Sequence, residues 1–149
     1  MTVNPELVGR VFPPTAPYLV GREKVREFAR AVFADDLQHS DPAAARALGY
    51  ADVVAPPTFA MVIQDLTLQQ LLAEPDSGIE LSRLLHGEQR FRYTRPIVAG
   101  DELTARLAVT GIRTLGGNAM VTSEAEMTDA AGSHVVTATS VLLVGEGDA

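Results

Sequence analysis

The segment over residues 57–74, PTFAMVIQDLTLQQLLAE, carries apolar side chains around most of the circumference of a helix. Its apolar residues are Phe59, Ala60, Met61, Val62, Ile63, Leu66, Leu68, Leu71 and Leu72. A surface helix has a single apolar stripe, whereas a helix that is apolar nearly all round is buried. Pro57 suits the first turn and Pro75 marks the end. The sequence therefore predicts one long, buried helix over 57–74.

After this helix the chain changes to the alternation of apolar and polar residues that is typical of strands. Leu103 and Leu107, for example, alternate with Thr104 within the stretch 84–144. The last predicted strand, about 134–144, is apolar on both faces, which indicates a central strand or a subunit contact. The sequence thus predicts antiparallel strands from about Leu84 to Val144.

Helices followed by a run of antiparallel strands indicate the α+β class. A flat sheet covers only one side of a helix, so a helix that is apolar all round requires a sheet that curls about it. This arrangement is the hot-dog fold, a long central helix wrapped by a curved antiparallel sheet. A helix near 22–32 and a short helix with Asp41 as its cap precede it. With 149 residues, the chain is predicted to form a single domain over 1–149.

Composition excludes several classes of function. The formal net charge of −7 argues against nucleic acid as a partner, because phosphate binding needs clustered positive charge. There is no cysteine, and no apolar run approaches the roughly 20 residues of a membrane helix. The first ten residues lack the basic and apolar regions of a secretion signal. We therefore expect a cytoplasmic protein without a membrane partner, and the sequence indicates no cofactor.

The cations are unevenly placed along this acidic chain. Eight of the twelve fall in two windows: Arg22, Lys24, Arg26 and Arg30, and Arg83, Arg90, Arg92 and Arg95. They can be a solvated helix face and a strand edge, or local positive patches that meet an anionic ligand or carrier. The carrier-binding candidates are Arg90, Arg92 and Arg95, or the helix face over 22–30.

The stretch FADDLQHSD, residues 33–41, gathers three carboxylates around His39. Three interpretations remain open: an ordinary polar loop, a metal site, and the working end of an enzyme. A metal site is disfavoured because no second histidine or cysteine stands at a ligand spacing from Asp35, Asp36 and Asp41. We expect no metal.

Three stretches together resemble a known family: ALGYADVVAPPTF (47–59), HGEQRFRYTRPIVAGDEL (86–103) and FADDLQHSD. They resemble the MaoC-like, or hydratase-2, branch of the hot-dog superfamily. The similarity is strongest to the small actinobacterial subunits of (3R)-hydroxyacyl-acyl-carrier-protein dehydratases, which carry a FAS1-like dehydratase domain. It runs from about Val8 to Val144.

The family's catalytic signature, Gly-Asp-x-Asn-Pro-x-His, places its histidine on His39. Asp36 takes the Asn position, Leu37 the Pro position and Phe33 the Gly position. The aspartate of the catalytic dyad falls on Ala34. The resemblance therefore implies that the catalytic histidine is present and that its partner aspartate is missing. We assign Asp36, a neighbour of the missing position, as the candidate carboxylate.

The implied reaction removes water from a 3-hydroxyacyl thioester, or adds it to an enoyl thioester. A histidine can take the α-proton and protonate the departing hydroxyl, while the carboxylate fixes that hydroxyl or a water. Charge on the thioester oxygen needs N–H donors, which the start of the central helix supplies. Proline has no N–H, so with Pro57 there the donor would be Thr58 or Phe59.

The resemblance implies an acyl-thioester substrate, carried by acyl carrier protein or coenzyme A. The substrate-binding candidates are Thr58, Phe59, Val62, His86 and Gly87. We expect the chain to supply an acyl pocket and dimer surface, with a hot-dog partner subunit supplying an intact dyad. The alternatives are a homodimer that uses His39 with Asp36, a non-enzymatic acyl-thioester binding protein, and a hot-dog thioesterase.

Overall fold

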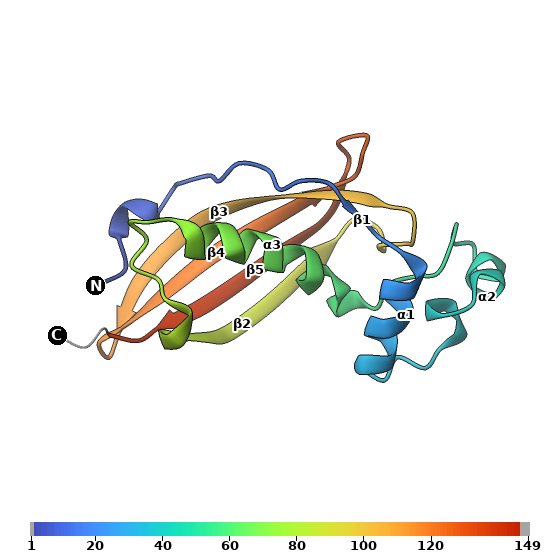
Figure 1. The fold of residues 1–149 in the computed structure, drawn as a ribbon, viewed down its shortest axis with the longest axis horizontal. Coiled ribbons are helices and arrows are strands. Elements are labelled where there is room, and N and C mark those ends of the chain that lie inside the picture. Colours follow the sequence, from blue (N-terminus) through green and yellow to red (C-terminus); the bar gives the residue numbers. More distant parts are fainter. Residues whose placement is uncertain (1, 147–149) are drawn as a thin grey trace.

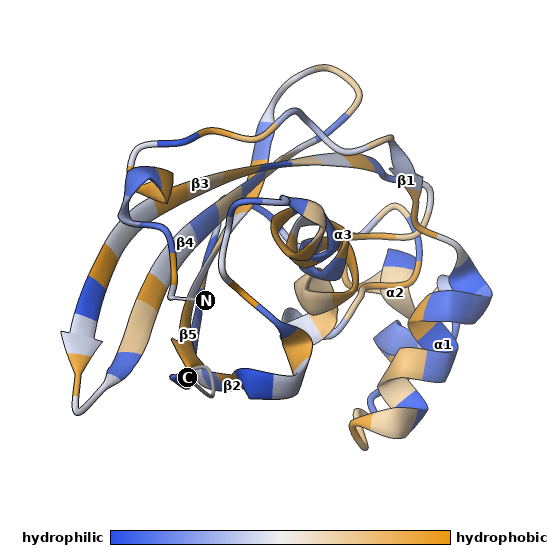
Figure 2. Cartoon of the chain, turned by 60° about the vertical axis from the view of Figure 1, so that its left-hand side comes forward, coloured by the Kyte–Doolittle hydropathy of each residue, from blue (hydrophilic) through white to orange (hydrophobic). Residues whose placement is uncertain are grey.

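The computed structural model describes residues 2–146 and shows one long helix in the hollow of a curved antiparallel sheet (Figure 1). The helices are α1 (Arg22–Ala31), α2 (Pro42–Ala47) and α3 (Ala60–Ala73), and the strands are β1 (Tyr18–Leu19), β2 (Leu84–Tyr93), β3 (Glu102–Leu115), β4 (Asn118–Thr128) and β5 (His134–Val144). Figure 2 shows α3 nearly end-on inside the curve of the sheet. The predicted α+β hot-dog fold is confirmed.

The five strands lie in the order β1-β3-β4-β5-β2, and every pair is antiparallel. β5 is paired on both sides, with β4 and β2, so it lies in the interior of the sheet. Among residues 2–146, β2 pairs with β5 alone, so its other side is a free edge of the sheet. Of the two alternatives predicted for the last strand, a central position or a subunit contact, the structure shows the interior position.

The predicted 57–74 helix is observed as a short 3-10 turn, η3 (Pro57–Phe59), that runs directly into α3. Ile63 and Leu71 are fully buried on the side of α3 that packs against β3 and β5. The N-terminal segment runs along β3 beside α3, with backbone hydrogen bonds such as that from Phe12 N–H to Leu107 O at 2.8 Å. It is tied to the helix by Gln70 Nε2, which donates to the carbonyl oxygen of Pro13 at 2.9 Å.

The helix was predicted to be buried, but in the single chain one side of α3 is exposed to solvent. Asp65, Leu66 and Gln69 are exposed, and Leu66 retains 36% of its accessible surface. The sheet covers one side of α3 and the N-terminal segment part of another, which leaves a third side open to solvent. No helix in the described part of the chain is long and apolar enough to cross a membrane.

α1 and α2 form a small lobe beyond the first turn of α3 (Figure 1). α1 is fastened to the core by an edge-to-face contact between Phe28 and Phe59, whose ring centroids lie 5.4 Å apart. α2 begins as the sequence indicates: Asp41 caps it by accepting from the Ala43 N–H at 2.9 Å, and Pro42 follows. This lobe carries His39.

β2 contains a bulge that changes which side chains face the helix. The pairing of β2 with β5 shifts between His86 and Glu88, at Gly87. As a result His86 pairs with Leu142 and Gln89 with Ser140, which places both on the inner face of the sheet. Without the bulge, two residues three positions apart would point to opposite faces.

Candidate active site

His39 ends a short 3-10 turn, η2 (Leu37–His39), and is half-buried. Its Nδ1 lies 2.7 Å from the carbonyl oxygen of Val54. Because a carbonyl oxygen can only accept, Nδ1 carries the proton and the neutral ring has its lone pair on Nε2. The Val54 N–H donates back to Gln38 O at 2.9 Å, so two hydrogen bonds fix the turn against this segment. His39 is held as an oriented potential base.

His39 lines a cavity of about 480 Å³ at the start of η3 and α3. The other lining residues are Gln38, Tyr50, Val54, Ala55, Pro57, Tyr93, Thr94, Arg95 and Pro96. Pro57, the first residue of η3, is among them, so the N-terminal end of the helix and the positive end of its dipole lie at this cavity. The fold therefore brings an imidazole and a helix N-terminus to one hollow.

The segment that holds His39 is anchored by Asp52. Its carboxylate accepts from Arg22 Nε at 2.9 Å and from the second guanidinium nitrogen at 2.8 Å. It also accepts from the Val53 N–H at 2.8 Å. Mainly through these hydrogen bonds, Arg22 lowers the pKa of the Asp52 carboxyl to about 2. The start of α1 is thus tied to the backbone beside His39.

In the loop before His39, the backbone at Phe33 has a conformation that is typical of glycine. Phe33 has a φ of 58°, the left-handed region that glycine favours, and its side chain is 84% exposed. Ala34 is half-buried, whereas Asp35 and Asp36 are exposed. Of these three positions, only 34 faces the protein.

Asp36 and His39 meet through the backbone, where the His39 N–H donates to Asp36 O at 3.1 Å. Within residues 2–146 the Asp36 carboxylate makes no hydrogen bond to the His39 ring, and it does not line the cavity. The geometry does not bring the two side chains together as a dyad.

The candidate oxyanion donors at the helix start differ in availability. The Phe59 N–H donates to Pro56 O at 2.9 Å. The Thr58 N–H makes no backbone hydrogen bond within the described residues, and Thr58 is exposed. The phenol of Tyr93 donates to Pro57 O and thereby anchors the turn that carries these amides.

Tyr93 was missed by the sequence reasoning as a site residue. Tyr93 and Phe91 alternate with Arg90 and Arg92, so the two rings share the inner face of β2, and this pattern is the signal that could have found Tyr93. Burial raises the pKa of the Tyr93 phenol from 10.0 to about 12. The phenol therefore stays a neutral hydrogen-bond donor across the physiological range.

We expect Tyr93→Phe to change how stability depends on alkaline pH. Because folding raises this pKa from 10.0 to about 12, the contribution of the neutral phenol is complete below about pH 10 and is lost toward pH 12. The free energy of unfolding of the wild type should fall more steeply in this window than that of the variant. Urea unfolding across the window measures both slopes, and equal slopes would contradict the prediction.

The remaining predicted substrate residues fall in different places. Phe59 is fully buried and packs in the core, and Val62 is half-buried against it. His86 lies on β2, where it lines a second cavity that His39 does not share. Gly87 lies at the bulge beside it.

The three carrier-binding candidates also differ. Arg95 forms ion pairs with Asp101 at 2.8 Å and with Asp129 at 3.2 Å, which join the loops at that end of the sheet. Arg90 lies 3.2 Å from Glu88. Arg92 is exposed on the outer face of β2.

The chain is similar to a known protein family, to curated relatives and to solved structures. A family model described as FAS1-like, dehydratase domain region, matches residues 6–138. A UPF0336 protein of Clavibacter michiganensis is 68% identical over 149 residues, 100% of each chain. The C-terminally truncated HadBC (3R-hydroxyacyl-ACP dehydratase) complex of Mycobacterium tuberculosis contains a chain that is 31% identical, with a TM-score of 0.85 over 92% of this chain and 96% of that one. A solved MaoC-like dehydratase is 40% identical, with a TM-score of 0.84, and the match covers 95% of this chain and 43% of that one.

Proposed function

The chain belongs to the FAS1-like dehydratase domain family, and from this membership we propose that it is a subunit of a (3R)-hydroxyacyl-thioester dehydratase or enoyl-thioester hydratase. Its substrate is an acyl group on acyl carrier protein or coenzyme A. The chain contributes an acyl-chain pocket and a dimer surface, and a second hot-dog subunit contributes the complete dyad.

The observation that carries this proposal is the placement of His39. Its Nδ1–H is fixed on Val54 O at 2.7 Å, and the ring borders a cavity at the start of the central helix. A base with a free Nε2 beside a helix N-terminus suits α-proton transfer next to a thioester carbonyl. Ala34 supplies no carboxylate to hold the hydroxyl or water, so we infer that the chain alone is a poor catalyst.

The free edge of β2 supports pairing with a second hot-dog. Within the described residues β2 is the last strand of the sheet on this side, and an open sheet edge is a template for another strand. Leu85 on this strand is 71% exposed. The similar HadBC protein is itself described as a complex. Edge-to-edge pairing through β2 would extend the sheet across two chains and close the open side of α3.

Hydration of a crotonyl thioester by the purified chain, alone and with a co-purified hot-dog subunit, tests the proposal. We expect little turnover alone and efficient turnover of the complex. Efficient turnover alone would favour the homodimeric enzyme. Acyl-thioester binding without turnover in either preparation would instead identify a binding protein.

We further expect charge reversal at Arg30, Arg90 and Arg92 to weaken binding of an acidic acyl carrier protein. All three are exposed, and attraction between opposite surface charges decreases as salt screens it. The variant should bind less tightly than the wild type, and its affinity should depend less on salt. The matched control is Arg113→Glu, an exposed cation on β3. An unchanged affinity and salt dependence in the triple variant would remove these arginines from the carrier contact.

A further inference from the structure

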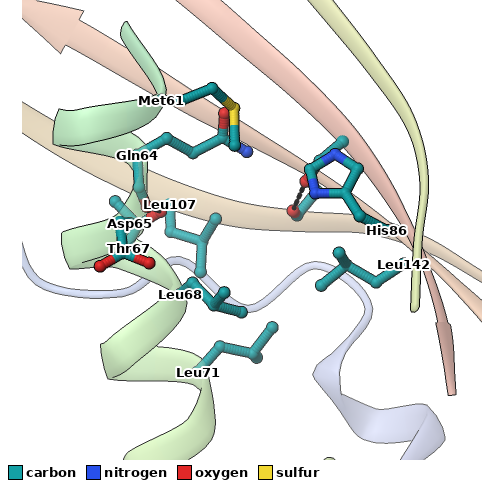
Figure 3. A pocket seen from close by; sticks show the side chains of 11 residues that line it. Met61, Gln64, Asp65, Thr67, Leu68, Leu71, His86, Leu107 and Leu142 are labelled. Carbon is teal, nitrogen blue, oxygen red and sulfur yellow. Dashed lines mark hydrogen bonds between the residues drawn. The ribbon is translucent and has the colours of Figure 1, made fainter. Parts of the chain in front are cut away.

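A second cavity lies between α3 and the inner face of the sheet, and it shares no lining residue with the cavity at His39 (Figure 3). Its volume is about 40 Å³. The lining residues are Met61, Gln64, Asp65, Thr67, Leu68, Leu71, His86, Leu107, Ser123, Ser140 and Leu142. One water needs at least about 10–15 Å³ of such space, so the cavity has room for one water, or a few at most, and not for a larger molecule.

Four of the lining side chains bring polar groups into this cavity from four different elements. They are Gln64 of α3, His86 of β2, Ser123 of β4 and Ser140 of β5. Gln64 is 6% exposed, and the two serines, which stand opposite each other in register, are 3% and 2% exposed. Figure 3 shows the Gln64 amide and the His86 ring on facing sides of the cavity. Buried polar groups from the helix and from three strands therefore converge on one small space.

The direct hydrogen bonds of these residues leave some of their donors unused. The two serine hydroxyl oxygens lie 3.1 Å apart, so one hydroxyl donates to the other, and the hydrogen of the accepting hydroxyl is not used in this bond. Gln64 Oε1 accepts from Gln89 Nε2 at 2.9 Å. Gln64 Nε2 makes no hydrogen bond among residues 2–146. Because an unpaired buried donor is costly, these groups favour a ligand that accepts hydrogen bonds.

Water is the ligand whose size and chemistry match the cavity. It can accept from a serine hydroxyl and from Gln64 Nε2, and it can donate to a nitrogen of the neutral His86 ring, which makes about three hydrogen bonds, the usual number for a buried water. An anion is disfavoured because the Asp65 carboxylate lines the same cavity. A cation is disfavoured because the Gln64 amide nitrogen offers only donors.

We propose that this cavity is a hydration site, in which one ordered water joins Gln64 of α3 to the serine pair of β4 and β5 and to His86 of β2. The water connects the central helix to β4 and β5, to which Gln64 makes no direct hydrogen bond among the described residues. It also gives a structural role to His86, which does not line the His39 cavity. The proposal is independent of the proposed function, because the site needs no substrate.

A high-resolution crystal structure of the purified chain tests the proposal directly. We expect electron density for a water at about 2.7–3.2 Å from Gln64 Nε2 and from one serine Oγ. In solution, oxygen-17 relaxation dispersion counts the long-lived internal waters. The double variant Ser123→Ala/Ser140→Ala should lose about one such water, because it removes the hydroxyls that hold it. Removing both hydroxyls leaves neither serine position with an orphaned partner, so the variant is expected to fold.

The matched control is Thr122→Val/Thr139→Val, which removes two hydroxyls from adjacent positions on the opposite face of β4 and β5. It should keep the water count of the wild type. A cavity without water density in the wild type, or density that refines only as an ion, would overturn the proposal. So would a water count that the serine variant leaves unchanged, or that the control lowers by the same amount.

Discussion

Ala34→Asp is expected to raise hydration of a crotonyl thioester by the isolated chain about 100-fold, the lower range for a positioned acid or base. Position 34 is half-buried while Asp35 and Asp36 are exposed, so a carboxylate there would face the protein. The left-handed φ of 58° at Phe33 gives the loop the turn that a glycine would give it. His39 is already oriented by Val54 O at 2.7 Å. The substitution would add the group that holds water against an existing base.

The measurement is kcat/KM of the isolated chain for crotonyl coenzyme A. The double variant Ala34→Asp/His39→Ala should return to the wild-type rate or below, because the carboxylate has no base to work with. Asp36→Ala serves as the control and should change little, since its carboxylate is exposed and outside the cavity. If Ala34→Asp changes nothing and His39→Ala does not affect an active complex, the loop is structural and the chemistry belongs to the partner.

Phe59→Ala is expected to lower the free energy of unfolding by about 3–5 kcal/mol. Phe59 is fully buried, and its ring meets Phe28 edge-to-face at a centroid distance of 5.4 Å and an interplanar angle of 79°. Truncation leaves a cavity at the junction of α1, η3 and α3. The two helices limit how far the neighbouring side chains can move to fill this cavity. The loss of stability is the sum of two terms: the transfer free energy of the buried ring and the cost of the cavity that remains.

Denaturant unfolding of the purified chain measures this change. Phe33→Ala is the matched control, because it removes the same ring from a position that is 84% exposed, and it should stay within about 0.5 kcal/mol of the wild type. A double-mutant cycle with Phe28→Ala would give the coupling of the two rings. A loss below about 1 kcal/mol for Phe59→Ala would mean that the lobe and the helix are not packed as described.

The sequence predicted the architecture because each signal was local. The period of two from 84 to 144 and the apolar 57–74 segment depend only on which side chains lie next to one another in an element. The cap at Asp41 followed by Pro42 likewise needs no tertiary contact to be recognised. These features led to the α+β hot-dog fold, with β5 at an interior position.

The candidate site was predictable in part. His39 was found by its match to a family signature, and it lies in a cavity at the helix start. Its hydrogen bond to Val54 joins residues that are distant in sequence, and so does the link between Arg22 and Asp52. Tyr93 reaches Pro57 in the same way. No local pattern encodes such pairs, because they exist only once the lobe is docked.

Tertiary structure alone decided two further points. The bulge at Gly87 reverses the alternation of β2, so that His86 and Gln89 share the inner face, which a strict period of two does not predict. The exposed side of α3 at Leu66 depends on how far the sheet curls, a property of strand twist and pairing rather than of the helix sequence. The sequence by itself determined which elements form and which residues are apolar; the packing of those elements decided which polar groups meet, because hydrogen bonds between distant segments require both to be in place.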